Sequence, residues 1–458
     1  MKLVMKFGGT SLDGVEGLRR CAALVQARAG TDRVAVVASA MDGVTEELMS
    51  LAEAAASGAR GVALAHLAAL RRRHEDAARA LGDATLVGAE LDRLERLASG
   101  IEAVGELTPR SRDAVLSFGE RLSTTLLHRA LLGEGLEARA FTGQEAGLVT
   151  DDRFGEAQPL IELSLYQVAE TLGAPLAAGA IPVVTGYIAA TQHGVTTTLG
   201  RGGSDYTATL LGAALEADEV WIWSDVEGMM SADPRVVPEA RRLERISFAE
   251  AVEMAQFGAK AMHPRALEPA AEHGIPVRMK NTFNPEGPGT LIANGADAPG
   301  EIARSIHLVR DAGMITVTGA AMIGHAGTAA RIFQILGERG INIRMISQSV
   351  SESAISLAIA GPQLEAARAA LEAGLLRTGW ARHVLVDEDL AIVAVVGSGM
   401  RGTPGVAARL FGAIARHGIN VVAIAQGSSE LSVSFAVSRE AGPEAVRALH
   451  SEFLGGRE

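Results

Sequence analysis

The last third of the chain contains an internal repeat, and this repeat constrains the fold more than any other feature. The segment that starts at Ile315 is ITVTGAAMIGHAGTAARIFQILGERGINIRMISQSVSESAISLAI, and it returns at Val393 as VAVVGSGMRGTPGVAARLFGAIARHGINVVAIAQGSSELSVSFAV, 78 residues later. The residue pattern of each copy predicts a strand, a glycine turn, an amphipathic helix that ends at a glycine, and two further strands. A unit this small cannot bury both faces of its sheet alone, so the copies are expected to pair.

The second copy contains a motif that also occurs in dinucleotide-binding folds. GSGMRG, residues 397–402, fits the pattern G-x-G-x-x-G between an apolar strand and a helix. The first copy reads GAAMIG there, without the middle glycine, and Gln426 stands near the end of the next strand, where an acidic residue would bind ribose. We interpret these glycines as turn residues of the repeat, with NAD binding as the weaker alternative.

The first two-thirds of the chain alternate short apolar runs with helical patterns, which indicates a mainly parallel α/β sheet covered on both faces. The expected strands are KLVMKF, RVAVVAS, AIPVVTGYI, EVWIWSD and IPVRMKN. From about residue 46 to 132, apolar residues three and four apart among Ala, Leu, Arg and Glu predict a helical insert. The turn-rich passage PEGPGTLIANGADAP, residues 285–299, predicts a boundary.

Composition argues against several classes of protein. The net charge of -12 and the pI near 5.5 disfavour a nucleic-acid binder. Cys21 is the only cysteine, which excludes an intrachain disulfide and a cysteine-rich metal site and suits a reducing compartment. The sequence shows no signal peptide and no uninterrupted apolar span. We therefore expect a cytoplasmic protein with no nucleic-acid or membrane partner.

Lysine is rare in this chain, since 38 of the 42 basic residues are arginines. The compact ammonium of lysine suits phosphate oxygens, so the few lysines are candidates for that task, although we interpret Lys2 as a surface residue. Lys6 stands in KFGGTS, where glycines after an apolar strand let backbone amides approach an anion. A helix is expected to begin near Ser11 and to point its N-terminus at the same place.

Three further motifs are candidates for binding an anionic ligand. In TTTLGRGGSD, residues 196–205, Arg201 stands between glycines where a helix is expected to start. Helix capping alone does not explain an arginine there, whereas bidentate binding of a carboxylate or phosphate does. WIWSDVEGMMSADPR leaves an apolar strand at Ser224 and Asp225, where ligands of open α/β sheets bind. QFGAKAMHP sets Lys260 after a glycine and before a helix. Zinc-hydrolase and P-loop motifs do not occur, so we predict no metal site built from protein ligands alone.

Taken in order, these motifs resemble those of the aspartate kinases of the amino-acid-kinase superfamily. The matching stretches are KFGGTS, VVASAMDGVT, SFGERLS, TGYIAATQHGVTTTLGRGGSDYTA, SDVEGMMSADPR, GAKAMHP and KNTFNPEGPGTLI, and the repeat is similar to the paired ACT modules of that family. The resemblance implies a three-layer αβα catalytic domain over residues 1–292. It also implies two α+β, ferredoxin-like ACT modules, one over 313–385 and one over 300–312 with 386–458.

The implied reaction is transfer of the γ-phosphoryl group of ATP, with Mg²⁺, to the side-chain carboxylate of L-aspartate, giving 4-phospho-L-aspartate. That reaction opens the pathway to lysine, threonine and methionine. The aspartate side chain, with a reference pKa of about 3.9, is ionised at neutral pH and needs no general base. The main obstacle to the reaction is the negative charge on the phosphoryl group, which lysine side chains neutralise. The alternatives are a kinase of another small acid such as glutamate, and a non-catalytic amino-acid sensor.

The resemblance also implies roles for individual residues. The catalytic residues would be Lys6, Asp205 and Lys260. The aspartate-binding residues would be Ser39, Thr45, Glu120, Arg201, Gly202, Gly203 and Ser204. The ATP-binding residues would be Lys6, Gly8, Gly9, Ser224, Asp225, Met230, Arg235 and Lys260. Ser224 and Met230 stand where the family usually has Thr and Tyr, so position 230 offers the nucleotide neither an aromatic ring nor a hydroxyl group.

The resemblance also implies that an amino acid regulates the activity. Gln348 in ISQSVSE and Gln426 in IAQGSSE occupy equivalent positions of the two copies, and IAQGSSE is similar to threonine-sensitive members of the family. We therefore expect an amino-acid effector at the ACT modules, with threonine favoured and lysine next. ACT modules usually pair across subunits, so the protein is expected to form a homodimer or a larger homo-oligomer.

Overall fold

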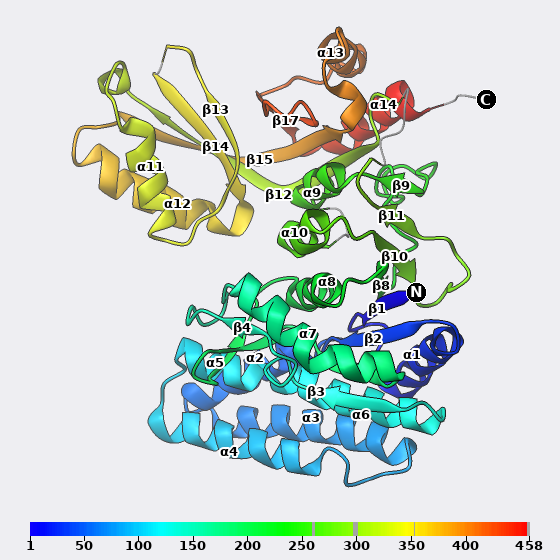
Figure 1. Ribbon diagram of the computed structural model, residues 1–458. Coiled ribbons are helices and arrows are strands. Elements are labelled where there is room, and N and C mark those ends of the chain that lie inside the picture. The colour runs from blue at the N-terminus through cyan, green and yellow to red at the C-terminus, as the bar shows by residue number, and fades with distance from the viewer. Residues whose placement is uncertain (259–261, 296–300, 352, 456–458) are drawn as a thin grey trace. The chain divides into compact units, whose positions relative to one another are not determined.

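The computed structural model describes residues 1–258, 262–295, 301–351 and 353–455 (Figure 1). Packing divides the chain into two compact units. The first consists of Met1–Met229, Glu244–Phe248 and Lys260–Ala296, and the second of Met230–Leu243, Ala249–Ala259 and Asp297–Glu458. Residues 1–292 thus contribute to both units, and the domain boundaries stay predictions.

The first unit is built on an eight-stranded sheet in the order β3-β5-β2-β1-β8-β10-β11-β9. Its strands are β1 (Lys2–Phe7), β2 (Arg33–Ala38), β3 (Ala138–Phe141), β5 (Ile181–Thr185), β8 (Glu219–Ser224), β9 (Arg245–Ile246), β10 (Val277–Asn281) and β11 (Thr290–Ile292). All described neighbours in this sheet pair in parallel except β10 and β11. Both faces of the central strands are buried, which is why β1 and β2 read as apolar runs.

Helices cover both faces of this sheet (Figure 1). Helices α1 (Gly14–Ala29) and α6 (Phe118–Gly133) pack on one face, and α7 (Ile161–Ala178) and α8 (Gly203–Leu215) pack on the other, where α10 (Pro264–Glu272) packs against α8. The segment expected to be helical also forms α2 (Val44–Ala56), α3 (Arg60–Ala80), α4 (Gly88–Val104) and α5 (Pro109–Leu116). A small sheet of β4 (Val149–Thr150), β6 (Ile188–Thr191) and β7 (Thr196–Thr198) completes the unit.

The first helix begins later than expected. Ser11 lies in a turn, where its hydroxyl makes a buried hydrogen bond of 2.6 Å with the hydroxyl of Thr282, and α1 starts at Gly14. The expectation that the helix starts near Ser11 was therefore wrong by three residues, because the Ser11 hydroxyl bonds to a distant segment and not to the amides of a helix start.

The second unit contains a six-stranded antiparallel sheet in the order β13-β14-β12-β15-β17-β16. Its strands are β12 (Ser305–Thr318), β13 (Ile343–Gln348), β14 (Ala354–Ala360), β15 (His383–Val396), β16 (Ala423–Gln426) and β17 (Ser432–Ser438). Strands β12 and β15 pair along their length and join the two copies of the repeat, so that residues 305–309 lie opposite residues 392–396 and residues 314–318 lie opposite residues 383–387. The two copies thus share one sheet, as expected from their small size.

Two helices pack on the sheet in each copy of the repeat. They are α11 (Thr328–Gly337) and α12 (Leu364–Leu371) in the first copy, and α13 (Val406–Arg416) and α14 (Gly442–Leu454) in the second. Short helical turns are η1 (Ala320–Met322), η2 (Gly361–Gln363), η3 (Glu372–Leu376) and η4 (Ser398–Met400), and α9 (Phe248–Gln256) precedes them in the chain. Together with the αβα unit, this architecture confirms the predicted fold class.

Close backbone packing in the second unit explains the glycines of GSGMRG. A Cβ on Gly399 would lie 2.1 Å from the carbonyl oxygen of Glu301, and one on Gly397 would lie 2.5 Å from that of Ile302. The backbone of a neighbouring segment therefore occupies the space where side chains would stand, which favours the turn interpretation over a dinucleotide site.

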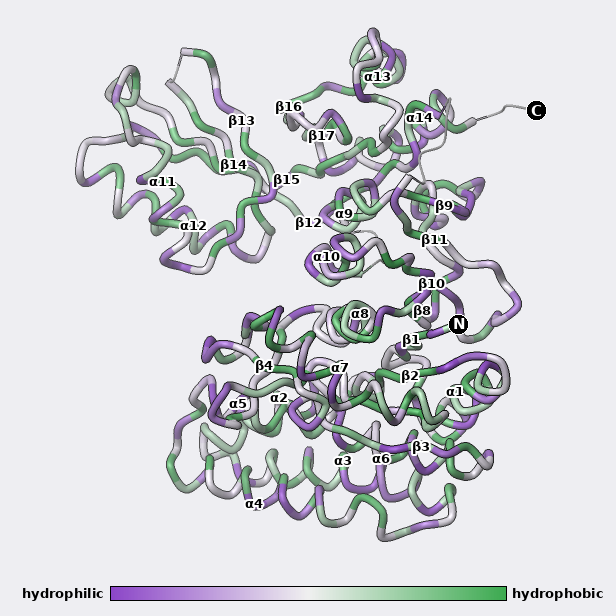
Figure 2. Tube along the Cα trace, in the orientation of Figure 1, coloured by the Kyte–Doolittle hydropathy of each residue, from purple (hydrophilic) through white to green (hydrophobic). Residues whose placement is uncertain are grey.

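Hydropathy follows this architecture. In Figure 2 the central strands β1 and β2 are mostly apolar, whereas α3 and α4 alternate between polar and apolar residues. None of the helices in the described part of the chain is both long and apolar enough to span a membrane.

Candidate active site

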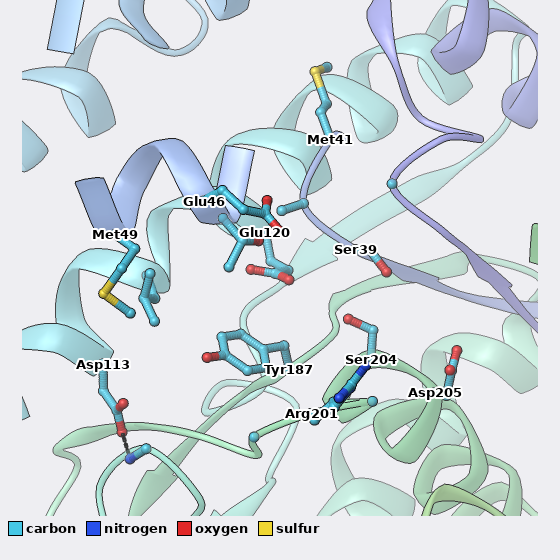
Figure 3. A pocket seen from close by; sticks show the side chains of 18 of the residues that line it. Ser39, Met41, Glu46, Met49, Asp113, Glu120, Tyr187, Arg201, Ser204 and Asp205 are labelled. Carbon is cyan, nitrogen blue, oxygen red and sulfur yellow. Dashed lines mark hydrogen bonds between the residues drawn. The ribbon is translucent and has the colours of Figure 1, made fainter. Parts of the chain in front are cut away.

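A cavity of about 540 Å³ lies in the first unit, where β1, β2 and β5 end (Figure 3). The sequence-predicted residues that line it are Lys6, Gly9, Ser39, Thr45, Glu120, Arg201, Gly202, Gly203, Ser204 and Asp205. The strand register explains why they meet. Phe7 lies opposite Ala38, and Ala38 lies opposite Thr185, so the residues that follow leave the sheet at one edge.

Lys6 and Asp205 form an ion pair of 2.6 Å between Nζ and Oδ1 at this edge. Their side chains are only 11% and 16% exposed, so water screens the pair little. Lys6 is near the end of β1 and Asp205 is in the first turn of α8. The pair therefore ties the two motifs KFGGTS and GRGGSD together.

Glycines let the backbone come close at two places around the cavity. A Cβ on Gly9 would lie 3.0 Å from the carbonyl oxygen of Ala40, which brings together the loops after β1 and β2. Gly202 has a φ of +73°, and a Cβ there would lie 2.4 Å from that of His263. The amides at the start of α8 thus stay open to an anion, and the helix dipole favours one at that end.

Glu120 is buried in the wall of the cavity. Its Oε2 has no hydrogen-bond partner within the described chain. Burial raises the pKa of Glu120 to about 8, although a hydrogen bond from the backbone of Ala40 and the charge of Lys6 act in the opposite direction. A buried carboxylate oxygen without a hydrogen-bond partner is a strong candidate to receive a cationic group of a ligand.

Tyr187 and Asp113 are among the cavity residues that the sequence analysis missed. Tyr187 follows β5 with a φ of +64°, and its ring stands between Glu120 and Arg201 in Figure 3. Asp113 is fully buried in α5 and accepts hydrogen bonds from Gly155 and Thr198. The signal for Tyr187 was its place directly after a strand end, but neither its backbone conformation nor its neighbours can be read from the sequence.

Among the residues that the structure describes, the remaining predicted nucleotide residues do not line this cavity. Gly8, whose amide donates to the carbonyl of Trp223 at 3.0 Å, lies at the same sheet edge with Ser224 and Asp225. Met230 and Arg235 belong to the second unit, where Arg235 forms an exposed ion pair of 2.6 Å with Asp233. Lys260 lies outside the described residues. The roles assigned to all these residues stay predictions.

The two glutamines expected to bind an effector line a cleft of about 490 Å³ in the second unit, between β13 and β16. Gln348 also lines a pocket of about 370 Å³ with the glycine turn and the start of α11. The repeat therefore places one glutamine of each copy at a common cleft.

Comparison with known proteins gives a consistent picture. Residues 1–281 match the amino acid kinase family, and residues 315–375 and 393–453 match the ACT domain. The chain is 35% identical to lysine-sensitive aspartokinase 3 of Escherichia coli strain K12, with 99% of each chain covered. It is 34% identical to chloroplastic aspartokinase 2 of Arabidopsis thaliana, with 98% of this chain and 84% of the relative covered.

Solved structures resemble the chain over its length. The structure of E. coli aspartokinase III in complex with aspartate and ADP superimposes with a TM-score of 0.84 at 33% identity, covering 99% of this chain and 100% of that one. The complex of that enzyme with lysine and aspartate gives a TM-score of 0.82 at 34% identity, covering 98% and 99%.

Proposed function

The chain belongs to the aspartokinases of the amino acid kinase family, and we propose that it transfers the γ-phosphoryl group of ATP to the side-chain carboxylate of L-aspartate. The product would be 4-phospho-L-aspartate, the first intermediate on the way to lysine, threonine and methionine. One observation carries the proposal: the Lys6–Asp205 ion pair, the buried Glu120 and the cation Arg201 share one cavity. The aspartate and ADP in the complex of E. coli aspartokinase III support the choice of substrates.

The chemistry requires charge neutralisation more than proton transfer. The acceptor carboxylate is ionised at neutral pH, so it attacks the γ-phosphoryl group without a base. Both reactants are anions, and Lys6 supplies a buried positive charge where they meet. Asp205 holds the Lys6 ammonium in place until the phosphates arrive.

The acceptor is held at its amino-acid end. The unpartnered Oε2 atom of Glu120 receives the α-ammonium of aspartate, and Arg201 binds the α-carboxylate through two hydrogen bonds. The amides of Gly202, Gly203 and Ser204 add donors at the positive end of α8. These contacts leave the side-chain carboxylate directed towards Lys6.

Magnesium is implied by the use of ATP. No group of three or more His, Cys, Asp or Glu side chains that could hold a metal ion by itself occurs in the described part of the chain. Mg²⁺ is commonly held by one or two carboxylates together with phosphate oxygens, and Asp205 offers such a carboxylate in the cavity, so the residues present fit it. When bound with ATP, the ion would neutralise part of the phosphate charge.

The test is an assay of ADP release that compares aspartate with glutamate. We expect turnover with aspartate and a much smaller kcat/KM with glutamate. Preference for glutamate would identify a kinase of another acid. Binding of amino acids at the second unit without ADP release on any acceptor would identify a sensor. Either result would overturn the proposal.

The effector proposed for the second unit is threonine. The described residues that line the smaller pocket around Gln348 include Thr328 and His325 but no acidic side chain to pair with the second ammonium of lysine. An α-carboxylate would face the start of α11, and the Gln348 amide would meet the threonine hydroxyl. Gln426 occupies the equivalent position in the other copy. Inhibition assays with each amino acid decide between threonine and lysine.

A homodimer is proposed through the same unit. Strands β13 and β16 end the six-stranded sheet, and they carry Ile346 and Ile424, which are 46% and 45% exposed. Edge strands with exposed apolar residues are favourable places for pairing with a second copy. Sedimentation of the wild-type protein and of Ile346→Glu tests this proposal, since the variant should shift the population towards monomer. The cytoplasmic location stays a prediction.

A further inference from the structure

Asp113 is a charged residue at a place where charge is unfavourable. It lies in α5 at the border of the cavity that contains Lys6, and its side chain is fully buried. Burying a carboxylate is costly unless hydrogen bonds replace the water that it loses. An apolar side chain would avoid this cost, so a carboxylate at this position points to a role for its particular hydrogen bonds.

Three hydrogen bonds hold the Asp113 carboxylate, and they come from two segments beside the cavity. Oδ1 accepts from the Thr198 hydroxyl at 2.9 Å, and Oδ2 accepts from the amides of Thr198 at 3.0 Å and Gly155 at 2.9 Å. A dashed line marks a hydrogen bond of Asp113 in Figure 3. The two segments are also bonded to each other, since the Ala157 amide donates to the Thr198 carbonyl at 3.0 Å. One side chain thus joins α5, the loop around Gly155 and the end of β7.

The end of β7 leads into the turn that carries Arg201. The strand ends at Thr198, and Arg201 follows between Gly200 and Gly202, whose φ values are +72° and +73°. The Gly203 amide donates to the Gly200 carbonyl at 3.0 Å and closes the turn, and α8 begins at Gly203. Because glycines give a backbone wide conformational freedom, the position of this turn depends on what holds its two ends.

The first end of the turn rests on the segments that Asp113 joins. A Cβ on Gly200 would lie 3.3 Å from Cγ of Glu156 and 3.4 Å from the carbonyl oxygen of Gly155. The turn therefore packs against the loop whose Gly155 amide is bonded to Asp113. The Arg201 side chain is exposed, so the backbone of the turn, and not a surrounding core, sets the position of its guanidinium group.

We infer that Asp113 is a positioning residue, which acts through Thr198 and Gly155 to hold Arg201 where it binds the α-carboxylate of the acceptor. The inference rests on the proposed function, which assigns that carboxylate to Arg201. Binding through two parallel hydrogen bonds requires that both N–H groups face both oxygen atoms. Because a misplacement of about 1 Å can cost about 10²-fold in rate, loss of Asp113 should weaken aspartate binding although the guanidinium group remains.

The first test compares Asp113→Ala with Asp113→Asn. Alanine removes all three acceptor bonds, whereas asparagine can turn its carbonyl oxygen towards the two backbone amides and its NH2 group towards the Thr198 hydroxyl oxygen. We expect the KM for aspartate to rise by about tenfold or more in Asp113→Ala and to change less than about threefold in Asp113→Asn. The KM for ATP should change less than about twofold in both.

Ser164→Ala is the matched control. The Ser164 hydroxyl is buried on α7, where it accepts from the Val149 amide at 3.0 Å and donates to the Val149 carbonyl at 3.0 Å. Val149 does not line the cavity. We therefore expect Ser164→Ala to lower the melting temperature without raising the KM for aspartate. A merely structural role for Asp113 would make Asp113→Ala behave in the same way, which would overturn the inference.

A double-mutant cycle tests whether Asp113 acts through Arg201. If it does, Asp113→Ala should lower kcat/KM for aspartate by about tenfold or more in the wild-type protein, but by less than about threefold in a protein that already carries Arg201→Ala. Additive losses would mean that Asp113 affects the cavity independently of Arg201, which contradicts the inference.

Thr198→Val and Thr198→Ser decide the matter should Asp113→Ala fail to fold. Valine removes the hydroxyl donor of Asp113, and serine restores it. We expect the KM for aspartate to rise several-fold in Thr198→Val and to stay at the wild-type value in Thr198→Ser. A folded Thr198→Val protein with an unchanged KM would overturn the inference.

The outcomes separate this inference from the proposed function. If the wild-type protein phosphorylates neither aspartate nor glutamate, or prefers glutamate, the proposed function fails. If it prefers aspartate and folded Asp113→Ala keeps the wild-type KM for aspartate, only the role of Asp113 is overturned.

Discussion

Two lysines of β1 stand in opposite environments, and this difference decides what each can do. The Lys6 ammonium is almost buried against Asp205, whereas Lys2 is half exposed and lies 3.9 Å from the exposed Glu216. A charge in a dry cavity acts strongly on a phosphoryl group, whereas an exposed ion pair contributes little. Because lysine is rare in the chain, each lysine was a candidate for binding phosphate, and burial distinguishes Lys6 from Lys2.

Replacing Lys6 tests this directly. We expect Lys6→Ala to lower kcat by 10²- to 10³-fold, or about 2.7–4 kcal/mol, by analogy with the loss of one oxyanion-stabilising donor. Lys2→Ala is the matched control on the same strand and should keep kcat within about twofold. Steady-state kinetics with saturating ATP and aspartate measure both. A Lys6→Ala protein that keeps most of its turnover would refute the catalytic role.

Glu120 predicts a pH dependence of aspartate binding. Because burial raises its pKa to about 8, the carboxyl group is protonated in the free protein near pH 6–7, whereas binding an ammonium requires the carboxylate. Affinity should therefore increase as the pH rises towards 8. We expect the KM for aspartate to fall about tenfold per unit below pH 8 and to level off above it.

The Glu120→Gln variant is the comparison for this profile. An amide cannot ionise, so its KM for aspartate should be higher than that of the wild type and nearly independent of pH between 6 and 8.5. The KM for ATP serves as the internal control in both proteins. A wild-type profile as flat as that of Glu120→Gln would mean that Glu120 is already ionised in the free protein.

At the scale of elements, the glycine turn before α13 is a packing device. Gly399 lies in η4, against the backbone of Glu301. We expect Gly399→Ala to destabilise the protein by about 1–3 kcal/mol, because the added methyl group forces the segments apart. Thermal unfolding measures the loss, and Gly100→Ala is the control, since Gly100 faces open space within α4 and alanine there should stabilise by about 0.5–1 kcal/mol.

The same measurement bears on the dinucleotide alternative for GSGMRG. If the glycines serve packing, NADH should leave the melting temperature of the wild-type protein unchanged. A rise on addition of NADH would revive the alternative, because a ligand that binds the folded state raises its apparent stability.

At the scale of the whole molecule, the proposed active site and the proposed effector site lie in different compact units. The cavity with Lys6 is in the first unit and the pockets with Gln348 are in the second, so inhibition requires two states whose balance the effector shifts. We expect threonine to inhibit the wild-type protein and Gln348→Ala to raise the half-inhibitory concentration at least tenfold.

A control for this effect lies in the same copy of the repeat. Gln334 is exposed on α11 and donates to Glu338, so Gln334→Ala should leave threonine inhibition unchanged. Dose–response curves with threonine and with lysine measure both variants. Inhibition by lysine alone would transfer the effector role to lysine and contradict our choice.

Much of the architecture could be predicted because it depends on local patterns. The runs KLVMKF and RVAVVAS form β1 and β2. The two copies of the repeat also have equivalent backbone conformations, since Gly327 and Gly405, 78 residues apart, precede equivalent helices with φ of +93° and +85°. Periodicity and glycine turns are properties of neighbouring residues, so they are visible without coordinates.

The sequence by itself determined which segments are strands, where the chain turns, that the two copies of the repeat pair, and which charged residues are candidates for a site. Only the tertiary structure decided that Lys6 pairs with Asp205, that burial raises the pKa of Glu120 to about 8, and that Tyr187 lines the same cavity with a φ of +64°. The physical reason is that strand register, burial and hydrogen-bond direction depend on residues far apart in the chain. A short stretch of sequence therefore does not predict these three properties.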